Sequence, residues 1–231
     1  MRKYTQAEFD ALPVIDGVRQ CPTADYSAVR DFGAWCSFGA WCGFGAWCSF
    51  GARCSFGEQC SFGELCRFGE LCRFGERCSF GAGCSFGELC RFGEQCSFGK
   101  WSGFGKWCDF GERCGFGAWS GFGELCRFGA WCSFGELCRF GEQCVFEGRH
   151  KALPGYPLLA FGGGGSVNHP VYAFNVEGGP IVRAGCFVGT LDAFRAKVRA
   201  DGDRLKALQY LAFANIVAAT WCPDKVDYKG E

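Results

Sequence analysis

A six-residue repeat occupies the middle of this 231-residue chain and limits what the chain can fold into. The unit Phe-Gly-x-x-Cys-x recurs from Phe32 to Val145, and only Ser102 and Ser120 interrupt its Cys position. A period of six fits neither a helix with 3.6 residues per turn nor an alternating strand. It does fit a parallel β-helix in which each hexapeptide forms one side of a three-sided coil.

The composition follows from the repeat and excludes several classes of protein. The chain has 37 Gly, 26 Phe and 20 Cys, and it carries 24 Lys+Arg against 24 Asp+Glu. This charge balance lacks the basic excess of nucleic-acid-binding proteins. A hydrophobic fraction of 48% is too high for a disordered protein. We therefore expect a folded protein, and we consider binding to nucleic acid improbable.

The first residues, Met1–Gln6, are followed by polar residues rather than by the apolar stretch of a secretory signal. No window approaches 18 consecutive apolar residues, so no membrane-spanning helix is expected. These features predict a cytoplasmic protein without membrane contact.

If three hexapeptides make one coil, the variable positions of the repeat should show a period of 18. The fourth position then sorts into three columns, which start at residues 35, 41 and 47 and each continue every 18 residues. The first column and the third column are mostly Trp and Leu, whereas the second is polar in its middle. The residue before Phe is small throughout one column: Gly43, Ser61, Ser79, Ser97, Gly115 and Ser133. Both patterns favour a coil of three hexapeptides.

The repeat resembles that of the left-handed β-helix hexapeptide proteins. The segment Phe32-Gly33-Ala34-Trp35-Cys36-Ser37 has their large apolar first residue, small second residue and small fifth residue. The resemblance implies a mainly β fold, a three-sided parallel left-handed β-helix of about six coils. We expect an N-terminal cap with a short helix over residues 1–31, the β-helix over 32–147, and a small C-terminal α+β domain over 148–231.

The N-terminal segment has the pattern of a short helix that caps the β-helix. Thr5 and Glu8 form a capping-box pattern for a helix that carries Phe9 and Leu12 and stops at Pro13. Tyr26 lies one period before the first Phe of the repeat, which suggests that it opens a degenerate first rung.

The C-terminal region has the pattern of three strands and two helices. The strands are expected over 156–161, 171–176 and 181–186, with the flexible run 162–166 between the first two. Thr190 and Asp203 are candidate N-caps for the helices. With the repeat, a motif at Val182–Phe187 resembles the Phe-Gly-x-x-Cys proteins encoded by phages and prophages. That resemblance implies the cytoplasm of a bacterial host.

The repeat cysteines could be metal ligands, disulfide partners or small interior residues. Serine replaces cysteine on consecutive rungs at Ser102 and Ser120, which a ligand or a bridge would not tolerate. No Cys-x-x-Cys pair exists, and the only histidines, His150 and His169, lie outside the repeat. We therefore favour buried free thiols, and we predict neither a metal site nor a cofactor.

The apolar side chains of the first and third columns are the candidate protein-binding residues, because contiguous exposed aromatic residues usually mark an interface. The candidates are Trp35, Trp47, Trp101, Trp107, Trp119, Leu65, Leu71, Leu89, Leu125 and Leu137. Coverage of these side chains by the C-terminal domain is the alternative. The face of small Gly and Ser residues is a second candidate surface.

No catalytic constellation is evident. Hexapeptide β-helix acyltransferases use a histidine on a coil or loop, and this repeat has neither a histidine nor a loop insertion. Cys186 and His169 could form a nucleophile–base pair, but a core cysteine in a strand and a surface histidine are the simpler interpretation. The run 162–166 lacks the lysine of a phosphate-binding loop.

The leading hypothesis is a non-catalytic β-solenoid that binds a host protein. The phage resemblance suggests inhibition of a host defence enzyme or of a nucleic-acid-processing enzyme. The alternative is a self-associating scaffold or virion accessory protein, which includes a homodimer. An acyltransferase-like enzyme is the least favoured hypothesis.

Overall fold

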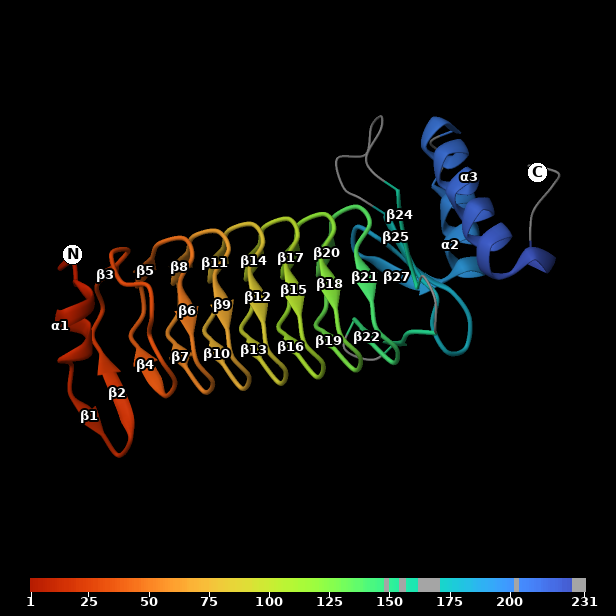
Figure 1. Ribbon diagram of the computed structural model, residues 1–231. Coiled ribbons are helices and arrows are strands. Elements are labelled where there is room, and N and C mark those ends of the chain that lie inside the picture. Colours follow the sequence, from red (N-terminus) through yellow and green to blue (C-terminus); the bar gives the residue numbers. More distant parts are fainter. Residues whose placement is uncertain (148–149, 154–156, 162–170, 202–203, 226–231) are drawn as a thin grey trace. The chain divides into compact units, whose positions relative to one another are not determined.

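The computed structural model describes residues 1–147, 150–153, 157–161, 171–201 and 204–225. The chain divides into two compact units, Met1–Arg149 and His150–Glu231. Figure 1 shows the repeated coils of the first unit and the strands and helices of the second.

The first unit is a β-solenoid whose sides are three parallel sheets, named here sheets I, II and III. Sheet I contains, in spatial order, β1 (Val14–Ile15), β2 (Val18–Cys21), β4 (Cys36–Phe38), β7 (Ser55–Phe56), β10 (Arg73–Phe74), β13 (Arg91–Phe92), β16 (Asp109–Phe110), β19 (Arg127–Phe128) and β22 (Val145–Phe146). Sheet II contains β3 (Asp25–Tyr26), β5 (Gly43–Phe44), β8 (Ser61–Phe62), β11 (Ser79–Phe80), β14 (Ser97–Phe98), β17 (Gly115–Phe116) and β20 (Ser133–Phe134). Sheet III contains β6 (Ser49–Phe50), β9 (Arg67–Phe68), β12 (Ser85–Phe86), β15 (Gly103–Phe104), β18 (Gly121–Phe122) and β21 (Arg139–Phe140).

The register of the sheets confirms the coil of 18 residues. On sheet II, Ser79 pairs with Ser61 on one side and with Ser97 on the other. Tyr26 pairs with Phe44 and so forms the degenerate first rung that its position predicts. With that rung, sheet II has seven strands, and the solenoid has about seven turns.

The Phe side chains fill the interior as three interlocking stacks. Phe68 lies parallel to Phe86 of the next coil, with ring centroids 4.8 Å apart and planes 3° apart. Its edge meets Phe74 of the following side at 5.1 Å and 87°. Each such aromatic pair contributes about 0.5–1.5 kcal/mol beyond the burial of its area. The Phe side chains therefore form a continuous ladder along the interior.

From Gly51 onward, the Gly after each Phe is required because successive coils approach closely there. A Cβ atom at Gly87 would lie 2.6 Å from the backbone nitrogen of Glu70 and 2.7 Å from the carbonyl carbon of Gly69, both in the preceding coil. No side chain fits in that space, so this position of the repeat accepts only glycine.

The helix of the N-terminal cap begins where it is predicted but ends earlier than expected. Helix α1 (Gln6–Asp10) has the capping box of Thr5 and Glu8. It ends before Leu12, which corrects the expected extent. Phe9 is 1% exposed, and its ring meets Phe32 edge-on at 4.9 Å, so it covers the first Phe of the solenoid.

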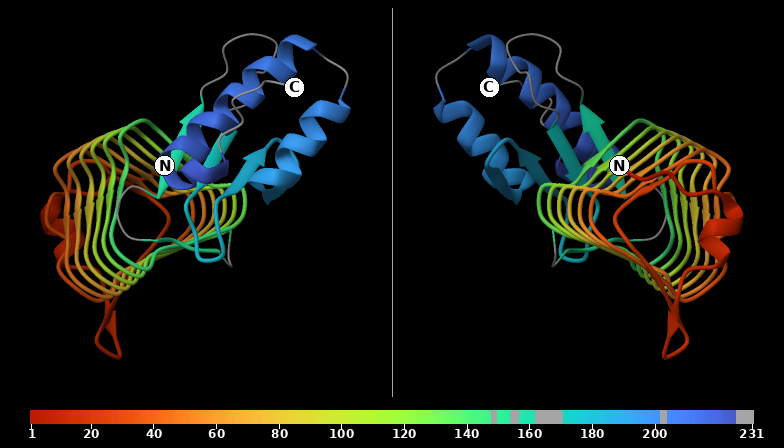
Figure 2. Two further views of the ribbon diagram at one scale, coloured as in Figure 1. Left: turned by 90° about the vertical axis from the view of Figure 1, so that its right-hand side faces the viewer. Right: turned by 90° about the vertical axis from the view of Figure 1, so that its left-hand side faces the viewer.

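An unpredicted hairpin follows the cap helix. Strands β1 and β2 are antiparallel and joined by Asp16 and Gly17. These two residues have φ angles of 49° and 78°, as in the type I′ turns that Asp-Gly favours. The hairpin extends from one side of the coils (Figure 2).

The second unit is an antiparallel sheet with two helices. Its elements are β23 (His150–Lys151), β24 (Leu158–Phe161), β25 (Val171–Phe174), β26 (Ile181–Ala184), β27 (Phe187–Thr190), α2 (Leu191–Ala200), α3 (Arg204–Trp221) and the 3₁₀ helix η1 (Pro223–Lys225). Strands β24 to β27 pair in sequence order. Val182, Phe194 and Phe213 belong to the core between sheet and helices.

Two expectations for the second unit need correction. The predicted third strand ends at Ala184, because the chain turns at Gly185, whose φ is 55°. A further strand, β27, then pairs with it, so the sheet has four strands where three were expected. Thr190 caps α2 as predicted, accepting a hydrogen bond from the Ala193 backbone. The other expected cap, Asp203, and the run 162–166 lie outside the described residues.

Candidate functional site

The fourth residue of each hexapeptide lies at a corner of the solenoid, in the left-handed backbone region. Figure 2 shows these corners along the axis. The φ angles of the non-glycine corners run from 56° at Leu137 to 65° at Trp131, and Gly83, the only glycine corner, has 70°. This conformation costs an ordinary L-residue about 1 kcal/mol or more. None of these corners is Asn or Asp, the residues that tolerate it best. Large side chains therefore stand at corners where the backbone does not favour them.

Most of the predicted protein-binding side chains are exposed at these corners. Trp47 and Trp101 are 68% and 61% exposed. Leu71 and Leu125 are half-buried. The remaining candidates are also exposed: Trp35, Trp107, Trp119, Leu65, Leu89 and Leu137.

Two exposed corner tryptophans were not among the predicted residues. Trp41 and Trp131 are 56% and 40% exposed. They belong to the second column, which was set aside because its middle is polar. Their shared fourth position in the repeat is the signal that could have found them.

The third column brings two candidate side chains into direct contact. The indole rings of Trp101 and Trp119 stack with centroids 5.1 Å apart and planes 8° apart. In the first column, the Arg53 guanidinium lies 4.7 Å from the Trp35 ring centroid. Stacking between coils therefore holds corner side chains in place while they stay exposed to solvent.

The repeat cysteines face the interior, as the sequence predicts. The Cys114 thiol donates a hydrogen bond to the Gly93 carbonyl of the preceding coil at 3.4 Å. Its interaction with the Cys132 thiol, followed by burial, raises the pKa of Cys114 to about 12. The buried Ser120 hydroxyl donates a hydrogen bond to the Gly117 carbonyl at 2.8 Å. A serine therefore fits this position as a cysteine does.

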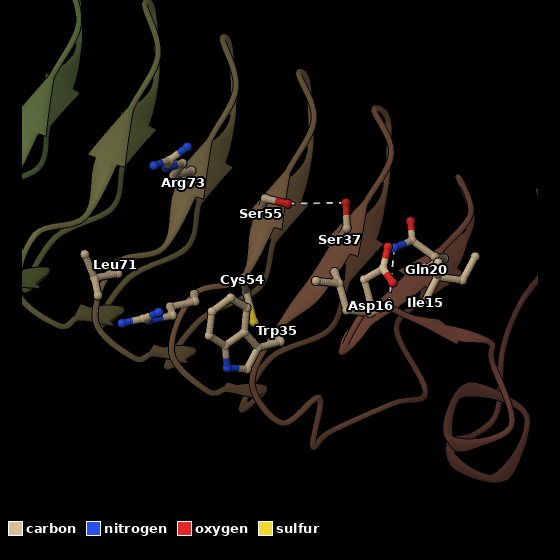
Figure 3. A pocket seen from close by; sticks show the side chains of 11 residues that line it. Ile15, Asp16, Gln20, Trp35, Ser37, Cys54, Ser55, Leu71 and Arg73 are labelled. Carbon is tan, nitrogen blue, oxygen red and sulfur yellow. Dashed lines mark hydrogen bonds between the residues drawn. The ribbon is translucent and has the colours of Figure 1, made fainter.

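A pocket of about 680 Å³ lies beside the unpredicted hairpin on sheet I. Figure 3 shows Ser37, Ser55 and Arg73 in one row along the sheet, with Trp35 and Leu71 in a second row. The hairpin residues Ile15, Asp16, Val18 and Gln20 line one end, and Arg53 and Cys54 complete the lining. Trp35 and Leu71 are among the predicted binding residues, whereas the pocket that they line was not predicted.

The structure corrects the expectation for Cys186. This residue is exposed between β26 and β27 and is not a core residue of a strand. His169, the candidate base, lies outside the described residues. Within the described ranges, no group of three or more His, Cys, Asp or Glu side chains is arranged to hold a metal ion. Nor does any helix in those ranges have the length and apolarity to cross a membrane.

Comparison with protein-family models finds similarity to the RNA-binding, Nab2-type zinc finger over residues 47–63, 53–69, 65–87, 78–99 and 125–146. These segments cover less than half of the chain, and the first two are offset by one hexapeptide. They contain no histidine, because His150 and His169 lie outside them. The similarity therefore reflects the regular spacing of cysteines. No curated protein and no solved structure matches the chain.

Proposed function

We propose that the chain is a non-catalytic protein-binding module whose contact surface is the row of apolar side chains in the third column. The supporting observation is the stack of Trp101 on Trp119, solvent-exposed at corners with left-handed backbone. Tryptophan is enriched among residues that dominate protein–protein binding energies.

The cost of the corner conformation supports this assignment. Glycine adopts it without strain, and Gly83 occupies it in the same column. Folding alone therefore does not require an indole at Trp101 or Trp119. A large exposed side chain that destabilises the backbone is best explained by a contact outside the chain.

We also propose the class of protein that this surface binds. The resemblance to left-handed hexapeptide proteins of phages and prophages suggests a bacterial host protein, such as a defence or nucleic-acid-processing enzyme. Inhibition would follow from occupation of that enzyme's surface by the rigid coils. Exposed apolar columns would equally suit self-association, so a scaffold is the second candidate.

Capture from a bacterial lysate, followed by titration of the purified partner, tests the proposal. Trp101→Gln/Trp119→Gln should weaken binding at least tenfold, about 1.4 kcal/mol. Glutamine is a suitable replacement because Gln59 and Gln95 adopt the same backbone conformation. The matched control is Trp41→Gln/Trp131→Gln in the second column, which should bind like the unmodified protein.

Unchanged affinity in the Trp101/Trp119 variant would overturn the assignment of the surface. Light scattering of the unmodified protein distinguishes a self-associating scaffold from a binding module. Large polymers that the Trp101/Trp119 variant disperses, together with no captured partner, would replace the binding-module proposal with self-association.

A further inference from the structure

The pocket on sheet I combines an apolar wall with unpaired positive charge. Its wall contains Trp35 and Leu71, and its floor contains Ser37, Ser55 and Arg73. Its volume of about 680 Å³ falls within the usual range for ligand sites, about 300–1,000 Å³. These residues come from three successive coils, so they are held by a rigid scaffold.

The charge around Arg73 favours an anion. Arg73 is exposed and pairs in register with Arg91 on the next coil. Arg91 has a partner, Asp109, at 3.9 Å. In the part of the chain that the structure describes, Arg73 has no ion pair. Two like charges side by side destabilise a sheet, and an anion bound at Arg73 would relieve that repulsion.

The remaining polar groups add a donor and a second cation. Ser55 donates a hydrogen bond to the Ser37 oxygen at 3.3 Å, so the Ser37 hydroxyl hydrogen can point into the pocket. Arg53, which lies over the Trp35 ring, also lines the pocket. Asp16 contributes the single negative charge, from the hairpin turn at the opposite end from Arg73.

We propose that this pocket binds an extended peptide segment through an internal acidic residue, with its carboxylate on Arg73 and an adjacent aromatic side chain packed along the row of Trp35, Arg53 and Leu71. Arginine binds carboxylates through two parallel hydrogen bonds. The acidic residue is internal because the two rows of side chains continue beyond Arg73 and Leu71, to Arg91 and Leu89, so a chain can pass through. The site lies outside the third column and does not depend on the proposed function.

Titration calorimetry with three short peptides tests the proposal. The probe is acetyl-Ala-Glu-Phe-Ala-amide, and its neutral control has Gln in place of Glu. A third peptide has Gln and a free terminal carboxylate. The probe should bind about tenfold more tightly than the neutral peptide, and Arg73→Gln should remove that difference. High salt should reduce it, because the charges are exposed.

Matched variants separate the pocket from general effects. Arg67→Gln changes the same repeat position on sheet III, and Trp107→Gln changes the same column farther along the solenoid. Both should bind the probe normally, whereas Trp35→Gln should weaken all peptide binding. The Trp101/Trp119 variant should also bind the probe normally, so the two proposals fail independently.

Four outcomes would overturn the proposal. The neutral peptide could bind as tightly as the probe, or Arg67→Gln could be as harmful as Arg73→Gln. Binding of only the free-terminus peptide would reject an internal acidic residue. A single-stranded oligonucleotide that binds through Arg73, with no binding of the probe, would assign the site to phosphate instead.

Discussion

At the scale of the residue, two positions of the hexapeptide have opposite steric requirements. The second position touches the preceding coil so closely that Gly87 has no space for a Cβ atom. The fourth position turns the corner and accepts large side chains there despite its left-handed backbone. The sequence predicts the interior Phe and Cys because their period is strict. It does not predict the corner angles, because Trp, Leu and Arg seldom adopt them.

Gly87→Ala should lower the free energy of unfolding by about 1–3 kcal/mol, because the new methyl group would force adjacent coils apart. Gly103→Ala is the control. The same substitution there meets no atom within 4 Å, so its effect should be within about 0.5 kcal/mol. Urea denaturation measures both, and equal shifts in the two variants would contradict the close-packing argument.

Stability should also fall at alkaline pH, because the fold raises the pKa of most of the stacked thiols. The pKa of Cys126 is raised from 9.0 to about 12, by its interaction with Cys108 and then by burial. Unfolded thiols ionise near pH 9, so the unfolded state binds fewer protons above that pH. The thiol contribution is complete below pH 9 and is lost as the pH rises through 12.

Urea midpoints measured between pH 7 and pH 11 under reducing conditions test this dependence. The midpoint should be constant up to about pH 8 and then decline. A flat profile to pH 11 would show that the thiols ionise equally in both states.

At the scale of the element, the two ends of the chain differ in how well their sequence specifies them. The capping box at Thr5 and Glu8 is a local signal, and α1 begins where it predicts. The Asp16-Gly17 sequence is also a local signal, because it favours a hairpin turn. The hairpin was not predicted from it, so one end of the pocket was not predicted either. Strand β27 was missed because it contains Gly189, a poor strand former.

Phe9→Ala should destabilise the solenoid by about 3–5 kcal/mol, because the buried ring of the cap covers Phe32. Loss of the cap would also expose a sheet edge to a second copy. Leu12→Ala, which changes a half-buried residue beyond α1, should have a smaller effect. Unfolding by urea and size-exclusion chromatography measure the two consequences, and a monomer of normal stability would contradict the capping role.

At the scale of the whole molecule, the three sides of the solenoid are equivalent inside and different outside. Every side contributes Phe and Cys to the interior, with Ser102 and Ser120 in place of two Cys. Outside, sheet II carries Gly and Ser, and sheet I carries charged residues such as Arg73 and Arg91. Interior and exterior are thus specified by separate positions of the repeat. The interior could be predicted from the period alone, but the pocket depends on the hairpin.

Deletions within the repeat should follow this equivalence. Removal of residues 80–97 deletes one coil, and removal of 80–85 deletes one side. Both keep the Phe spacing, so both variants should show β-type circular dichroism and cooperative unfolding. Removal of 80–82 breaks the spacing and should abolish folding of the solenoid. Cooperative unfolding of that variant would show that the period is not what determines the coil.

The orientation of the strands also has a mechanical consequence. Strands of neighbouring coils bond along the solenoid axis, as when the Ser97 amide donates to the Cys78 carbonyl at 2.9 Å. A pulling force along that axis acts on one inter-coil interface after another, and the terminal coil carries no second neighbour to share its load. Under tension the solenoid should therefore unwind from its ends in steps of 18 residues, much as a spring loses one turn at a time.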